Sequence, residues 1–176
     1  MILNSNIVLK HSIWYKMQDL YPVQNGPKPK IALFPRLIDA FIVACTIGMK
    51  ANTRIENDEK EEVASVNSKT YNDPVNDDIK RTMDYMLKIL ILTMDLPELS
   101  GVSRNDKEKL AFASDFNIDK FNPINIMTEY ANYGATKLVE LMTDQDTETI
   151  NNIIEYLDSL KLENEILPDI DDFGTI

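Results

Sequence analysis

The sequence is poor in the residues that most often build reactive or metal-binding sites. It has one cysteine, Cys45, and one histidine, His11, in 176 residues. A single thiol cannot form a disulfide within the chain, and thiolate or histidine-rich zinc sites need several such ligands. A Ser-His-Asp or Cys-His arrangement would have to use His11, which has no supporting motif around it. The sequence therefore predicts no metal, no cofactor and no catalytic residue, so we expect a non-enzyme, although an enzyme that works with carboxylates alone stays open.

Glycine and long apolar runs are also scarce. The chain has 5 glycines, and their spacing matches neither a phosphate-binding loop nor a dinucleotide fingerprint. The longest apolar run covers residues 40–45, which is too short to cross a membrane. The first nine residues lack the basic segment and long apolar core of a secretory signal. We therefore expect a cytoplasmic protein in a reducing compartment, with no membrane partner.

Helical patterns fill much of the remaining sequence. Apolar residues recur at helical spacing between turn and capping signals, and abundant Leu, Ile, Met, Lys and Glu favour helices. The expected helices cover 35–50, 77–96, 105–116, 123–142 and 147–162, with a further one inside 6–20, where residues 7–9 also fit an extended segment. The helix at 35–50 and the second half of that at 77–96 are apolar on nearly all sides, which is typical of buried helices. The sequence predicts an all-α fold, a compact bundle of about five or six helices.

Charge is distributed unevenly along the chain, whose net charge is −11. Residues 1–54 carry seven Lys or Arg and two Asp or Glu, a net of +5, whereas residues 144–176 carry one and ten, a net of −9. Residues 55–76 are acidic and contain few large apolar side chains, so we expect a long mobile acidic loop there. We expect a single helical domain over 1–162, including this loop, followed by an acidic tail at 163–176.

A small, polar patch interrupts the helix expected at 123–142. Ala131, Gly134 and Ala135 stand at i, i+3 and i+4, which places them on one helical face, where small side chains let two helices approach closely. The patch either packs against the helix at 35–50, which contains Gly48, or forms a docking face for a partner subunit. The second interpretation, together with the apolar residues of the tail, gives these candidate partner-binding residues: Tyr130, Asn132, Tyr133, Gly134, Ile170 and Phe173.

Two segments carry a resemblance to known proteins. They are "LFPRLIDAFIVACTIGMKANTR" at 33–54 and "EYANYGATKLVEL" at 129–141. They resemble a family of small helical accessory proteins encoded beside bacterial DNA-phosphorothioation and other anti-phage defence genes. The chain is also similar in size and layout to the small subunit of Lamassu-type defence complexes, which work with an SMC-like ATPase and a nuclease effector. The matching positions are Phe34, Asp39, Ala44, Gly48, Arg54, Glu129, Tyr130, Ala131, Asn132 and Gly134, while Tyr133 departs from the first Gly of the family pattern.

The resemblance implies no catalysis. It implies a non-catalytic accessory or scaffolding subunit of an anti-phage defence complex, with the ATPase and the nuclease as protein partners and DNA contacted only indirectly or weakly. The alternative is a nucleic-acid-binding regulator that uses the basic N-terminal third, with Lys28, Lys30, Lys50 and Arg54 as candidate contacts. The overall negative charge opposes that alternative, because phosphates repel an acidic chain.

Overall fold

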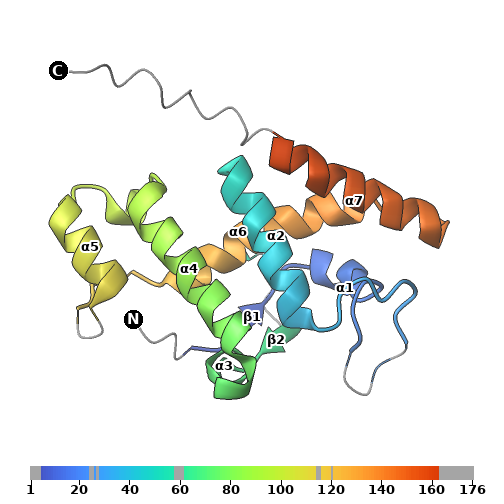
Figure 1. Cartoon of the computed structure of the whole chain (residues 1–176), viewed down its shortest axis with the longest axis horizontal. Coiled ribbons are helices and arrows are strands. Elements are labelled where there is room, and N and C mark those ends of the chain that lie inside the picture. The colour runs from blue at the N-terminus through green and yellow to red at the C-terminus, as the bar shows by residue number, and fades with distance from the viewer. Residues whose placement is uncertain are drawn as a thin grey trace, which may run out of the picture. The chain divides into compact units, whose positions relative to one another are not determined.

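Helices account for most of the structure (Figure 1). The computed structural model describes residues 5–23, 26, 28–57, 62–113, 116–119 and 121–162. These residues form seven α-helices, two short 3-10 turns and one two-stranded sheet. The predicted helical class is confirmed in its main part, but the fold is not purely α, and two of the helices have five residues each.

The chain divides into two units, Met1–Val139 and Glu140–Ile176, which are described separately. This division differs from the boundary expected after residue 162, which stays a prediction. The acidic tail at 163–176, with Ile170 and Phe173, lies outside the described residues.

Helix α2, Leu37–Ala51, is the apolar helix expected from the sequence. We predicted Pro35 as its first residue, but Arg36 is extended, with φ −145°, so the helix begins two residues later. The Arg36 guanidinium donates to both carboxylate oxygens of Asp39, at 2.9 and 2.8 Å, in the first turn, where a negative charge is favoured. The helix ends at Asn52, whose left-handed φ of 47° turns the chain out of the helix.

Helix α6, Pro123–Glu140, begins where the sequence predicted. Pro123 is its first residue, and the Asn122 Oδ1 accepts a hydrogen bond from the Asn125 backbone N–H at 3.2 Å. This combination suits a helix start, since proline has no N–H to leave unsatisfied and the amide caps another.

Helices α4, Asp77–Thr93, and α5, Arg104–Phe112, pack against each other (Figure 1). Between them lies the 3-10 turn η2, Pro97–Leu99. Ser103 caps α5, because its hydroxyl accepts a hydrogen bond from the Asp106 N–H at 3.1 Å. Leu87, Leu90 and Leu110 are fully buried, so both helices contribute to the core.

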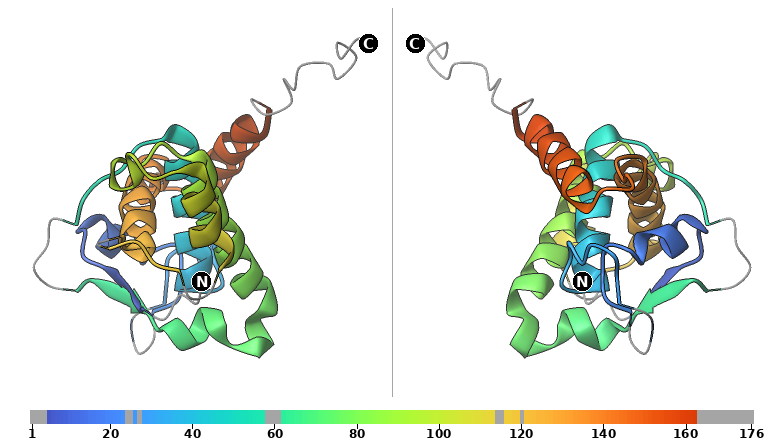
Figure 2. Two further views of the ribbon diagram at one scale, coloured as in Figure 1. Left: turned by 90° about the vertical axis from the view of Figure 1, so that its left-hand side faces the viewer. Right: turned by 90° about the vertical axis from the view of Figure 1, so that its right-hand side faces the viewer.

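The first part of the chain forms a strand and a short helix. Strand β1, Ile7–Leu9, pairs antiparallel with β2, Ala64–Val66 (Figure 2). In this register Ile7 lies opposite Val66. Ile7 and Leu9 are buried and Val8 is half-buried, the alternation expected of a strand with one face on the core. The extended interpretation of residues 7–9 is therefore confirmed. Helix α1, Ile13–Met17, follows and buries Trp14 and Met17.

The segment expected as a long acidic loop, 55–76, is largely structured in its described part. It contains β2, the helix α3, Ser68–Asn72, and the 3-10 turn η1, Pro74–Asn76. The Asn67 and Asp73 side chains cap these two turns by accepting backbone hydrogen bonds at 2.9 Å. The prediction of an irregular loop is therefore wrong for residues 64–76. Few large apolar residues are present there, but local side-chain caps and pairing with β1 order the segment.

The second unit contains helix α7, Asp146–Leu162. The Thr149 hydroxyl accepts a hydrogen bond from the Thr143 N–H at 2.8 Å, and the Asn152 amide donates to the Leu141 carbonyl at 3.2 Å. These bonds tie the preceding turn to the start of the helix. Ile153 is buried, whereas Ile154 is 48% exposed.

Candidate functional site

The small-residue patch of α6 packs directly against α2. A Cβ atom added to Gly134 would collide with the backbone of Ala44, and one added to Gly48 would collide with the backbone of Tyr130. Each helix thus contributes a glycine to the point where the two backbones meet. The packing interpretation of the patch is confirmed, because Ala131, Gly134 and Ala135 are all buried there.

Asn132 is a fully buried hydrogen-bonding hub next to this crossing. Its Oδ1 accepts from the Trp14 indole Nε1 at 2.9 Å. Its Nδ2 donates to the Ile55 carbonyl at 3.0 Å and to the Asn57 Oδ1 at 3.2 Å. One amide therefore joins α1, α6 and the chain that follows α2, and its polar atoms are satisfied within the fold.

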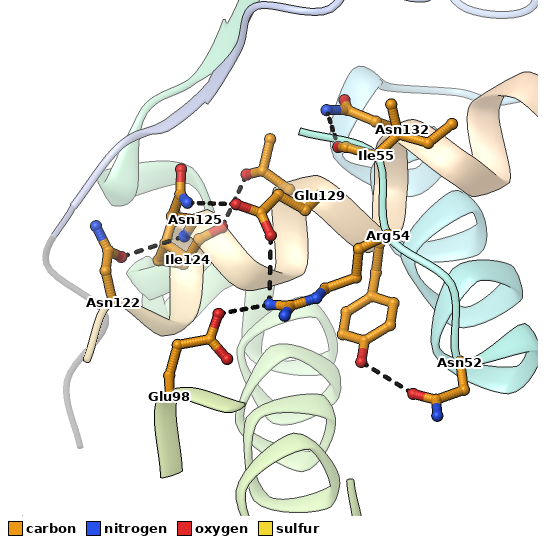
Figure 3. Close-up of polar contacts among 11 residues, drawn as sticks. Asn52, Arg54, Ile55, Glu98, Asn122, Ile124, Asn125, Glu129 and Asn132 are labelled. Carbon is orange, nitrogen blue, oxygen red and sulfur yellow. Dashed lines mark hydrogen bonds and ion pairs between the residues drawn. The ribbon is translucent and has the colours of Figure 1, made fainter. Parts of the chain in front are cut away.

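Arg54 lies between two carboxylates, Glu98 and Glu129 (Figure 3). Its Nη1 is 2.7 Å from Glu98 Oε1 and 3.3 Å from Glu129 Oε2. The guanidinium carbon also lies 5.8 Å from the centre of the Tyr130 ring, and the Tyr130 hydroxyl donates to the Asn52 Oδ1 at 3.2 Å. The network thus connects α2, η2 and α6 through side chains that are far apart in the sequence.

The two carboxylates respond in opposite directions to this environment. Burial raises the pKa of Glu129, and the negative charges of Glu98 and Glu56 add to that effect, although Arg54 and Asn125 oppose it. Burial also acts to raise the pKa of Glu98, but hydrogen bonds from Arg54 and from its own backbone outweigh it, so that pKa is lowered. Arg54 therefore pairs mainly with Glu98. Of the two glutamates, Glu129 is the weaker acid.

The four predicted partner-binding residues that the structure describes do not form a common exposed surface. Tyr130 and Asn132 are 2% and 0% exposed, and Gly134 is buried against α2, so these three stabilise the interior instead of forming an exposed docking face. Tyr133 is half-buried, and its ring lies 5.6 Å from the Lys137 ammonium. Tyr133 therefore differs from Tyr130, Asn132 and Gly134, because it is not part of the buried interior.

The predicted nucleic-acid contacts are also divided. Lys28 and Lys30 are exposed, but the Lys50 Nζ is buried. Arg54 is engaged by Glu98 and Glu129, and its side chain is only 22% exposed. A phosphate would have to displace two carboxylates to reach Arg54, so the four residues do not act as one basic surface.

An open polar pocket of about 780 Å³ lies beside this network. Its lining includes Lys10, Asn57, Glu62, Asn122 and Asn125. The Asn57 Oδ1 accepts from the Lys10 backbone N–H at 3.3 Å, and the Asn125 Nδ2 donates to Glu129 at 2.7 Å. These amides are therefore already used to hold the fold together.

Four large apolar side chains are exposed on α4 and α5. Tyr85, Ile89 and Leu92 of α4 are 70%, 42% and 38% exposed, and Phe112 of α5 is 65% exposed. We call these four residues the α4–α5 face. The sequence predicted burial on nearly all sides of the second half of this helix, and that is wrong for Ile89 and Leu92. The only signal in the sequence was the spacing of residues 85, 89 and 92 at i, i+4 and i+7, which makes them one stripe.

The chain matches no protein-family model, and no curated protein or solved structure is significantly similar to it. The defence-system resemblance therefore stays a prediction from the sequence. In the part of the chain that the structure describes, no helix is long and apolar enough to span a bilayer.

Proposed function

We propose that this chain is a non-catalytic accessory subunit of a bacterial anti-phage defence complex, which binds a larger ATPase or nuclease subunit. Two independent considerations support the proposal. The resemblance at 33–54 and 129–141 suggests the kind of complex, and the α4–α5 face provides a surface suited to binding a protein.

The α4–α5 face is the observation that carries the proposal. Four large apolar side chains from two adjacent helices lie exposed on one unit of the protein. Large exposed apolar patches commonly mark protein-interaction sites, because water leaves them when a partner binds. Full burial of one such side chain is worth roughly 1.5–3 kcal/mol, so a few of them can dominate the stability of an interface.

The buried network refines the role of the residues that carry the resemblance. Gly48, Gly134 and Asn132 hold α1, α2 and α6 together. In our proposal these residues build a rigid scaffold, and the α4–α5 face on that scaffold binds the partner. The partner-binding role first expected of the α6 patch therefore moves to α4 and α5.

The test is copurification of tagged, full-length chain from its own host, with proteins identified by mass spectrometry. We expect an ATPase or nuclease at a fixed stoichiometry with the unmodified chain. A variant with Ile89→Asp and Leu92→Asp should lose it, because two carboxylates would have to be desolvated in the interface. Tyr15→Glu is the matched control, since Tyr15 is 58% exposed on α1, outside the face.

Two results would reject the proposal. Recovery of no ATPase or nuclease with the unmodified chain would remove the function itself. Recovery of the same partner with the Ile89→Asp, Leu92→Asp variant would show that the α4–α5 face is not the surface that binds it.

A further inference from the structure

The α4–α5 face continues into a groove of about 810 Å³ between the end of α4 and α5. Leu92, Val102 and Phe112 supply its apolar lining. Its polar lining comes from Thr93, Arg104, Lys107 and Glu108. The groove therefore combines apolar side chains with charged residues that come from α5.

The geometry of the face suits a helix. Tyr85, Ile89 and Leu92 stand at i, i+4 and i+7 along α4, so they form a stripe roughly 10 Å long at 1.5 Å per residue. Phe112 lies near the Leu92 end of this stripe, since the two side chains line the same groove. Two turns of an amphipathic helix present apolar residues over the same length, which is how helices commonly bind in grooves.

Cations predominate around this apolar surface. Lys88, Arg104 and Lys107 border it, against the carboxylates of Asp84 and Glu108. Three positive and two negative groups give a local net charge of +1, in a chain whose net charge is −11. The border of the face is thus opposite in sign to the protein as a whole.

The cations are placed to meet a ligand on the face. The Lys88 Nζ lies 5.2 Å from the centre of the Phe112 ring and forms a partly exposed ion pair with Asp84 on the same helix. The Arg104 side chain is 93% exposed, and its bond to Glu108 is a surface pair at 3.1 Å. Such exposed pairs contribute little, so a partner carboxylate can compete for Arg104 at small cost.

We infer that the α4–α5 groove binds an amphipathic helix of the partner protein whose apolar stripe is flanked by acidic residues. The inference rests on the proposed function and adds the chemistry of the partner. The apolar stripe of such a helix covers the α4–α5 face, and its carboxylates lie against Lys88, Arg104 and Lys107. A helix flanked by lysines would meet the same apolar surface with unfavourable charge.

Two synthetic peptides test the charge preference. Both are 18-residue helices with the same leucine stripe, one flanked by glutamates and the other by lysines, and binding to the full-length chain is followed by fluorescence anisotropy. We expect the glutamate peptide to bind about tenfold more tightly, since it gains two or three exposed ion pairs with the groove. The comparison is stringent, because the net charge of −11 favours the lysine peptide by general attraction.

Variants of the chain test whether the preference for the glutamate peptide arises in the groove. Arg104→Glu combined with Lys107→Glu should reverse the preference, and Lys16→Glu, on α1, should leave it unchanged. Ile89→Asp with Leu92→Asp should weaken both peptides. Equal affinity of the two peptides, a preference for the lysine peptide, absence of binding by either, or a preference that survives the Arg104 and Lys107 reversal would each overturn the inference.

The copurification separates this inference from the proposed function. An ATPase or nuclease that is lost with Ile89→Asp and Leu92→Asp, and also with the Arg104 and Lys107 reversal, supports both. If it is lost with the first variant but retained with the second, the function stands and the acidic helix is rejected. If the apolar variant instead abolishes self-association of the purified chain, measured by light scattering, the occupant is a second copy and the inference is rejected.

Discussion

The α2–α6 crossing and the α4–α5 face both appear apolar in the sequence, but the first is buried and the second is exposed. At the crossing, Gly48 and Gly134 bring two backbones into contact, and the side chains around them are buried. On the face, Tyr85 and Phe112 are 70% and 65% exposed. Small residues at helical spacing therefore marked a contact inside the protein, while large residues marked the surface left open.

The difference follows from what each surface needs from a neighbour. A contact through glycine requires two backbones to approach closely and in a fixed position. Two helices of the same chain meet this requirement most readily. Large side chains such as Tyr85 remain exposed in the fold, and in our proposal they contact a second protein. We therefore expect substitutions at the crossing to change stability and substitutions on the face to change binding.

The largest expected effect is that of Gly134→Ala at the crossing. The added Cβ would collide with the Ala44 backbone, which cannot rotate away as a side chain would. We expect a loss of about 3 kcal/mol in the free energy of unfolding, even though alanine favours a helix more than glycine by about 1 kcal/mol. Urea denaturation monitored by circular dichroism measures it.

Thr136→Ala is the matched control, because Thr136 is on the same helix and half-buried, and its hydroxyl bonds only to the Asn132 carbonyl, at 3.0 Å. It should cost less than about 1 kcal/mol. A Gly134→Ala protein as stable as the unmodified chain would mean that α2 and α6 separate easily, and the comparison drawn above would fail.

The second prediction concerns the polar hub beside the crossing. Asn132→Ala removes three hydrogen bonds and leaves the buried indole N–H of Trp14 without its acceptor. We expect a loss of about 2 kcal/mol, the typical cost of leaving a buried polar group unsatisfied. Trp14 is the only tryptophan in the chain and is fully buried, so its fluorescence in urea reports the transition directly.

Asn125→Ala serves as the comparison for this change. Asn125 is exposed, and its amide donates to Glu129 at 2.7 Å. Its loss should cost clearly less than that of Asn132. Equal losses of unfolding free energy for the two variants would show that the burial of Asn132 adds nothing to its contribution to stability.

Much of the crossing was predictable from the sequence, and the contacts around it were not. The spacing of Ala131, Gly134 and Ala135 indicated a helix-packing surface, and the helix expected from residue 123 begins there as α6. These signals are local, since capping and helical spacing involve residues within one or two turns. The start of α2 was misplaced because Arg36 adopts an extended conformation after Pro35.

Contacts between distant residues explain what the sequence did not reveal. Arg54 pairs with Glu98, 44 residues away, and β1 pairs with β2 across more than 50 residues. A single sequence contains no signal for such pairings. The exposure of the α4–α5 face was missed for the same reason, because a helix that is apolar on most sides reveals its open side only when its neighbours are placed.

The third prediction uses pH to measure the Arg54 network. The Glu98 pKa is lowered in the folded protein, so the Glu98 carboxylate stabilises the fold above its unfolded pKa, and this contribution disappears as the pH falls through the folded value. We expect Glu98→Gln to cost about 1 kcal/mol at pH 7, discounted for its partial exposure, and nothing in strong acid. Urea denaturation at several pH values between 7 and 3 measures the difference.

Two features sharpen this third test. The Glu129 pKa is raised mainly by burial, so its contribution has the opposite sign and falls as the pH rises. Glu108→Gln removes a fully surface ion pair on α5 and should change stability by only a few tenths of a kcal/mol at any pH. A Glu98→Gln effect that is the same at pH 7 and pH 3 would rule out charge pairing with Arg54 as its cause.

The smallest expected effect on stability belongs to the α4–α5 face. Tyr85→Asp with Phe112→Asp should change the free energy of unfolding by less than about 1 kcal/mol, because these side chains are already 70% and 65% exposed and lose little burial. The same variant should abolish partner binding, whereas Gly134→Ala should bind normally wherever it remains folded. A large loss of stability in the Asp variant would instead show that the face supports the core of its own unit, and its exposure would then have no relation to a partner.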